Sequence, residues 1–165
     1  MKETIFNTDI AGQKILVERD FDGSLSQVWK AWTDKDLLAE WWAPKPFKAV
    51  TKTMDFREGG HWHYYMLGPD GSQFWCMVNY TLVKPEERFD GDDYFCDEAG
   101  TRNHELPGNL WEVKFAPSGS GTRVHVTVKF ESKEDLEKIV AMGFKEGFAS
   151  AHKNLDELLA EKITL

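Results

Sequence analysis

The chain has 165 residues, of which 41% are hydrophobic and 13% aromatic, so it can bury a core without disulfides or structural metals. Its net charge of −8 disfavours nucleic acids and anionic membranes as partners, because both attract clustered Lys and Arg. We find neither the apolar stretch of an export signal nor a run of about 18 apolar residues that could span a membrane. Cys76 and Cys96 lack metal-ligand spacing, so we expect free thiols and a cytoplasmic protein.

The N-terminal part predicts one strand and two short helices. Alternating apolar residues indicate a strand over Lys14–Phe21. Ser24 is a suitable N-cap for a first helix, and a second helix begins at Asp34 and ends before Pro44. This region holds four of the seven tryptophans: Trp29, Trp32, Trp41 and Trp42.

From Phe47 to Phe130 the sequence alternates between strands and turns, with turn residues at 58–60, 69–71, 84–87 and 118–121. This short spacing indicates an antiparallel meander. A helix predicted over Asp135–Lys162 follows, with apolar residues every three or four positions. Together these elements predict an α+β helix-grip fold, in which a curved antiparallel sheet wraps around a long C-terminal helix and two short helices lie between the first two strands. We expect one domain over residues 1–165, with its core at about 14–160.

The turns predict which strand side chains share a face. A three-residue loop at 58–60 sets Phe56 opposite Trp62 and Met54 opposite Tyr64, whereas the turn at 69–71 sets Tyr64 opposite Cys76 and Trp62 opposite Val78. Both turns give the same apolar face. Its predicted members are Met54, Phe56, Trp62, Tyr64, Met66, Phe74, Cys76, Val78, Tyr80, Leu82, Trp111, Val113 and Phe115.

The C-terminal helix must cover this face, and it carries Gly143 and Gly147 one turn apart. A glycine inside a helix costs about 1 kcal/mol relative to alanine, so the missing side-chain volume has a use. Close packing of helix against sheet and space for a ligand are both consistent with the pattern.

Asp93 is the most interesting polar candidate. The alternation from Phe89 to Phe95 points it inward, where desolvation would raise its pKa and suit it to anchor a ligand or transfer a proton. The alternative is a bulge at Gly91 that turns Asp93 outward, and we favour it because the inward orientation rests on one strand. Tyr64 and Tyr80 are the other inward groups that can form hydrogen bonds.

The histidines do not predict a metal site. His61 and His63 form a His-x-His pair, but the register places them on the solvated face, and zinc needs at least one further ligand. Asp55, predicted opposite His63, is better interpreted as a cross-strand ion-pair partner. We expect His152, on the last helix, to lie at the surface. No metal and no cofactor is predicted.

Four segments together are similar to one known family: VWKAWTDKDLLAEWWAPKPF, MDFREGGHWHYYMLGPDG, FWCMVNYTLVKPEERF and MGFKEGFASAHKNLDELL. They resemble the homologues of the activator of the heat-shock protein 90 ATPase (C-terminal-domain type). This family belongs to the START-related, birch-pollen-allergen-like SRPBCC superfamily. The resemblance runs from Lys14 to Leu159 and implies a cavity between the sheet and the last helix. Trp42 and Pro44 match the WWxP element of the family, which we interpret as a hydrophobic plug for the short helix.

We therefore expect a protein that binds a small apolar or aromatic molecule in an internal cavity, with no defined catalytic activity and no catalytic residue. Sequence motifs of common enzyme classes are missing, and few inward groups are ionisable. The resemblance implies two alternatives: a polyketide-cyclase-like enzyme using the same cavity, and a chaperone-interacting protein, for which one domain gives little support. The candidate lining residues are Trp62, Tyr64, Met66, Phe74, Val78, Tyr80, Asp93, Trp111, Val113, Phe144 and Gly147.

Overall fold

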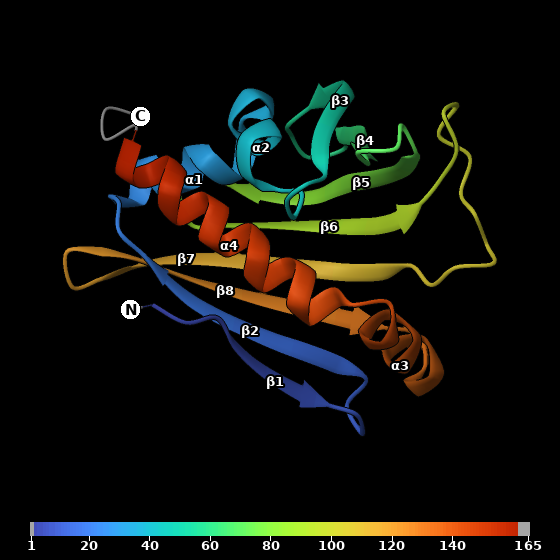
Figure 1. The fold of residues 1–165 in the computed structure, drawn as a ribbon. Coiled ribbons are helices and arrows are strands. Elements are labelled where there is room, and N and C mark those ends of the chain that lie inside the picture. The colour runs from blue at the N-terminus through green and yellow to red at the C-terminus, as the bar shows by residue number, and fades with distance from the viewer. Residues whose placement is uncertain (1, 162–165) are drawn as a thin grey trace.

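The computed structural model describes residues 2–161, which form eight strands and four helices (Figure 1). The strands are β1 Ile5–Asp9, β2 Lys14–Phe21, β3 Lys48–Asp55, β4 His61–Leu67, β5 Gln73–Lys84, β6 Arg88–Phe95, β7 Asn109–Ser118 and β8 Gly121–Phe130. The helices are α1 Leu25–Thr33, α2 Lys35–Trp41, α3 Lys133–Ala141 and α4 Phe144–Glu161.

All described strands belong to one antiparallel sheet in the order β1-β2-β8-β7-β6-β5-β4-β3. The sheet curves around α4, which crosses it diagonally, while α1 and α2 cover one end of the same face (Figure 1). This confirms the predicted α+β helix-grip fold. No helix within residues 2–161 is long and apolar enough to cross a bilayer.

The strand β1 is missing from the sequence prediction. It pairs with β2, setting Phe6 opposite Val17 and Thr8 opposite Ile15, and it forms one edge of the sheet. As an edge strand it is only partly buried, with Ile5 59% exposed, so its sequence lacks a clear alternation. The two short helices lie between β2 and β3, which are the first two strands of the prediction, and β1 precedes all of them.

The single helix predicted over Asp135–Lys162 is also wrong, since α3 and α4 are separate helices. The break lies at Gly143, whose φ of +93° is readily adopted only by glycine. The Gly147 N–H then donates to the Gly143 carbonyl, which restarts the helical ladder. Only Gly147 is therefore a glycine inside a helix. The predicted end at Lys162 lies outside the described residues.

The strand registers agree with one turn prediction and differ from the other. The turn at 69–71 sets Trp62 opposite Val78 and Tyr64 opposite Cys76, as predicted. The loop before β4 is longer than predicted, so Met54 lies opposite Trp62, two residues from its predicted partner. Because strand side chains alternate with a period of two, this shift leaves Met54 on the predicted face.

A register shift between Tyr80 and Leu82 makes one further side-chain orientation differ from the prediction. The extra residue of this bulge reverses the alternation in the rest of β5. Val83 consequently packs against the core, opposite Phe89, and the predicted inward orientation of Leu82 is wrong.

Polar side chains attach α4 to the rest of the fold. The buried Arg19 of β2 donates from both Nη atoms to the Asp156 carboxylate. At a second contact, the Asn154 amide donates to the main-chain carbonyls of Trp41, the last residue of α2, and Ala43. These bonds fix the position of α4 over the sheet.

His152 lies in the core, so its predicted surface location is wrong. It is 1% exposed, its Nδ1 lies 2.8 Å from Thr4 Oγ1, and its ring packs 4.2 Å from the ring of Phe148. It belongs to the buried stripe of α4 because it follows Phe148 by four residues and precedes Leu155 by three. Burial, with a contribution from the charge of Arg19, lowers its pKa to about 3.

Candidate ligand pocket

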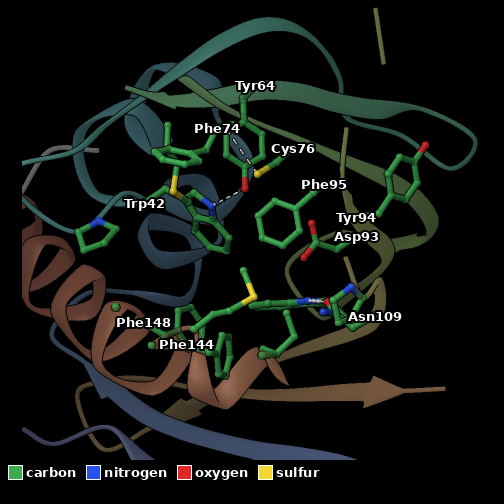
Figure 2. Close-up of a pocket in the computed structure, with 18 residues that line it drawn as sticks. Trp42, Tyr64, Phe74, Cys76, Asp93, Tyr94, Phe95, Asn109, Phe144 and Phe148 are labelled. Atoms are coloured by element: carbon green, nitrogen blue, oxygen red, sulfur yellow. Dashed lines mark hydrogen bonds between the residues drawn. The ribbon is translucent and has the colours of Figure 1, made fainter. Parts of the chain in front are cut away.

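A pocket of about 260 Å³ opens between the inner face of the sheet and the start of α4 (Figure 2). Strands β4 to β7 form one wall, and the α3–α4 junction forms the opposite wall. The segment after α2 and the loop after β6 complete it. Seven of the predicted residues line this pocket: Tyr64, Met66, Phe74, Asp93, Trp111, Phe144 and Gly147.

The other four predicted residues line a separate hollow of about 30 Å³: Trp62, Val78, Tyr80 and Val113. Asp93, Trp42 and Trp111 border both spaces. Trp62 is kept away from the larger pocket by its stacking on Tyr64, with ring centroids 3.8 Å apart. That any of these residues binds a ligand remains a prediction.

Trp42 and Pro44 line the larger pocket, and Trp42 also packs on Trp32 and Trp41 of the two short helices, as expected of a hydrophobic plug. The indole Nε1 of Trp42 donates to the Tyr64 hydroxyl at 2.9 Å, which fixes both rings on the same wall. The WWxP element was the sequence signal that could have identified these residues. Two helical turns of α4 contribute Phe144 and Phe148, whose rings stack at 5.5 Å.

Asn109 is a polar lining residue that the sequence interpretation missed. It precedes Trp111 by two residues in β7, and this alternation alone was enough to place it on the inner face. Trp111 Nε1 donates to Asn109 Oδ1 at 2.6 Å. The amide is thereby oriented, and its NH₂ group and the second lone pair of Oδ1 remain available for a ligand.

Asp93 lies on the inner face, beside Phe95 and Asn109 (Figure 2). The predicted outward orientation is wrong, because the pairing of β6 with both neighbours is regular from Gly91 to Asp93 and the bulge lies in β5. Asp93 is paired across the strands with Val78 on one side and Asn109 on the other. It remains accessible where it borders the pocket and is otherwise enclosed by protein.

The surroundings of Asp93 favour its neutral form. Burial raises its pKa from 3.8 to about 7, the charge of Asp92 adds to this rise, and the indole N–H of Trp111 opposes it. No Lys, Arg or His lines the pocket within residues 2–161. Arg102, near Asp93 in the fold, lies over the ring of Tyr94, 5.4 Å from its centroid. Since Tyr94 follows Asp93 directly, its side chain lies on the other face of β6.

The remaining polar groups of the pocket are poor acids. Burial raises the pKa of the Tyr64 hydroxyl well above its usual value, and it also raises the pKa of the Cys76 thiol. Both groups are therefore neutral at physiological pH, and the Cys76 thiol is unsuited to nucleophilic attack. Cys76 and Cys96 are both free. Among the described lining residues, Asp93 is the one suited to exchange a proton near neutral pH.

The His-x-His pair lies away from the pocket, on the other face of β4. His63 is 5% exposed, and its Nε2 lies 3.1 Å from the Asp97 carbonyl oxygen, so its predicted solvated environment is wrong. The loop after β6 covers it. Asp55 lies opposite His61, not His63, and pairs with Arg57 at 2.7 Å. Among residues 2–161, no three His, Cys, Asp or Glu side chains are arranged to hold a metal ion.

Residues 22–160 match the model of the family described as activator of Hsp90 ATPase homolog 1-like protein. The chain belongs to this family. The match agrees with the segments that carried the resemblance in the sequence. No protein of curated function matches the chain.

Solved structures of bacterial proteins share the whole fold. A crystal structure from Mycobacterium smegmatis has a TM-score of 0.88 at 29% identity, covering 95% of this chain and 96% of that one. A solution structure from Arthrobacter aurescens has a TM-score of 0.89 at 32% identity, covering 95% and 91%. A Nitrosomonas europaea protein, 24% identical over 96% and 100% of the two chains, has a TM-score of 0.82 and supports the fold alone.

Proposed function

We propose that this protein binds a small apolar or aromatic molecule in the pocket between the sheet and α4. One observation carries the proposal: large aromatic side chains surround a volume of about 260 Å³ that they do not fill. Around it, Phe148 packs edge to face with Trp42 and Trp111, which are tilted against each other, and the ring centroids lie 5.4–6.0 Å apart. An apolar site with few polar groups is typical of pockets for small ligands.

The size and chemistry of the pocket limit the ligand. Small-molecule pockets usually measure about 300–1,000 Å³, so a volume of about 260 Å³ suits a compact ring system better than a long lipid. Asp93 and Asn109 lie side by side on one wall and can bind a single polar group. The other lining residues favour a ligand whose remaining surface is apolar.

The free thiols of Cys76 and Cys96 support a cytoplasmic location as part of the proposal. A chaperone contact rests on the family description alone.

A second candidate function is an enzyme of polyketide-cyclase type that uses the same pocket. The observation in its favour is Asp93, because a carboxyl with a pKa of about 7 can act as a general acid or base near neutral pH. Tyr64 and Cys76 are too weakly acidic to assist it. Since one proton-transfer group rarely suffices for a cyclisation, binding remains the proposed function.

The proposal is tested by native mass spectrometry of the purified protein and by titration with naphthalenemethanol, a neutral bicyclic probe. We expect either a co-purified small molecule or saturable, one-to-one binding that changes the tryptophan fluorescence. The matched control is Gly147→Leu, because the added side chain enters the pocket. A protein that purifies without ligand and binds the probe no better than this variant would contradict the proposed function.

A further inference from the structure

The pocket contains one carboxyl group and no positive charge to pair with it. Asp93 forms no ion pair, and no basic residue within residues 2–161 lines the space in front of it. Buried carboxylates in proteins are normally paired with a cation or bound to several hydrogen-bond donors. The Trp111 indole N–H, which donates to Asn109 Oδ1, also interacts with the Asp93 carboxyl, but it is a neutral donor and supplies no positive charge. A bound ligand can therefore supply the cation that pairs with the Asp93 carboxylate.

The rings near Asp93 suit a cation. Trp42, Phe95 and Trp111 line the same pocket, and aromatic faces attract positive charge through their quadrupole. A carboxylate enclosed by aromatic rings is a recurrent chemical solution for binding ammonium groups, since it combines an ion pair with cation–π contacts. Asn109 Oδ1, oriented by Trp111, can accept a second N–H from the same nitrogen.

Building on the proposed function, we propose that the ligand is an arylalkylamine, with a ring system of about two fused rings and one positively charged aliphatic nitrogen that pairs with Asp93. The aromatic side chains of the pocket contact the ring system, and Asp93 and Asn109 bind the nitrogen. An anionic ligand is disfavoured because Asp93 and Asp92 repel it and no basic side chain lines the pocket. A neutral ligand gains the apolar contacts but leaves Asp93 without a cation.

The pairing makes binding depend on pH through Asp93. The ionisable groups around Asp93 are Tyr64 of β4, Cys76 and Tyr80 of β5, Asp92 of β6, and Cys96, which lies directly after β6. Burial raises the pKa of each tyrosine and each thiol, so none of these four loses its proton between pH 5.5 and 8.5. The α3–α4 wall contributes apolar residues, and Arg102 lies on the opposite face of β6. Over this range an aliphatic amine stays protonated, so its affinity follows the ionisation of Asp93.

The experiment compares three probes that share one ring system and differ in charge: naphthylmethylamine, naphthalenemethanol and naphthoate. Dissociation constants are measured by calorimetry for the wild type, Asp93→Asn and Asp92→Asn. The last variant is the matched control, because it removes the same charge from the neighbouring residue on the outer face of β6.

At pH 8 we expect the wild type to bind the amine about tenfold or more tightly than the alcohol, and the acid most weakly. Asp93→Asn should remove the preference for the amine, and Asp92→Asn should keep it. Below a pKa of about 7, the affinity of the wild type for the amine should fall by up to about tenfold per pH unit. Calorimetry in two buffers at pH 6.5 should detect proton release on amine binding, a readout that requires no variant.

Equal affinities for amine and alcohol, or a preference for the amine that persists in Asp93→Asn, would overturn this inference while leaving the proposed function intact. If none of the three probes binds the folded wild type, the inference is overturned, and the proposed function is overturned with it when no small molecule co-purifies with the protein.

Discussion

Asp93 is a carboxyl that the fold keeps on an apolar wall without a cation. Its pKa of about 7 follows from burial, so the folded state binds its proton more tightly than the unfolded chain does. The contribution of Asp93 to stability is thus fully present below pH 3.8 and decreases as the pH rises to about 7. At neutral pH the protein is less stable than the same fold without this charge. Such a penalty is common at binding sites, where a ligand supplies the missing interaction.

Replacing Asp93 with Asn should stabilise the folded protein near pH 8. Each unit of pKa difference corresponds to about 1.4 kcal/mol, so the gain in unfolding free energy is on the order of 2–4 kcal/mol and should shrink towards pH 4. Urea denaturation at several pH values measures it, with Asp92→Asn as the control. An Asp93 variant that is as stable as the wild type at pH 8 would show that the carboxyl is solvated.

His152 should make the protein sensitive to acid, with the opposite sign. Its pKa of about 3 lies below the ordinary 6.5, so its contribution to stability is present above pH 6.5 and is lost as the pH falls towards 3. His152→Leu keeps the apolar contacts and should reduce the loss of stability between pH 7 and 5. Loss of the contact with Thr4 should cost about 0.5–1.5 kcal/mol at neutral pH. Unchanged pH dependence in this variant would contradict the assignment.

Among the elements, the start of α4 determines the shape of the pocket. Gly143 allows the chain to change direction between α3 and α4. Gly147, one helical turn later, has no side chain that could extend from the helix into the pocket. A methyl group at Gly147 would lie 3.7 Å from Pro44 Cγ, an ordinary van der Waals distance. Close packing against the sheet therefore does not explain this glycine, whereas space for a ligand does.

Two substitutions of Gly147 separate these explanations. Gly147→Ala should stabilise the protein by up to about 1 kcal/mol, because alanine is the better helix former and meets no clash. Gly147→Leu should leave the fold intact and weaken binding of naphthalenemethanol by at least about tenfold, because its side chain occupies the pocket. Thermal unfolding and calorimetry measure the two effects. A destabilisation of about 1–3 kcal/mol in the leucine variant with unchanged binding would indicate a packing role.

For the whole molecule, the attachment of α4 to the sheet decides whether the pocket exists. Arg19 has a side chain that is 2% exposed and depends on Asp156 for its countercharge, whereas Asp156 is 38% exposed. A neighbouring ion pair joins Glu157 of α4 to Lys45 in the segment after α2, and its side chains are 62% and 67% exposed. Each pair joins a basic side chain to an acidic side chain of α4, but the two pairs differ in burial, so they should contribute differently to the free energy of unfolding.

Asp156→Asn should destabilise the protein by about 1–3 kcal/mol, because it leaves the buried guanidinium of Arg19 without its countercharge. Glu157→Gln, which breaks the exposed pair one residue later, should change stability by less than about 1 kcal/mol. Chemical denaturation of the two variants under the same conditions tests this. Equal effects would show that the helix is held by apolar contacts alone.

The sequence by itself determined the fold class and most of the inner face. Apolar alternation with a period of two kept Met54 and Tyr64 on the predicted side even though the register of the first hairpin is displaced, because a shift of two residues preserves the face. Local alternation also pointed Asp93 inward, although the alternative of a bulge was preferred.

Only the tertiary structure decided the features that depend on distant contacts. The edge strand β1 and the bulge after Tyr80 depend on pairing with neighbours, which local patterns do not encode. The break at Gly143 depends on a backbone conformation, and the burial of His152 depends on the rings that meet it from other elements. Trp42, Asp93 and Asn109 come from three separate segments. They meet at one pocket because the curved sheet brings its strands around α4, and this curvature arises from the packing of the whole chain.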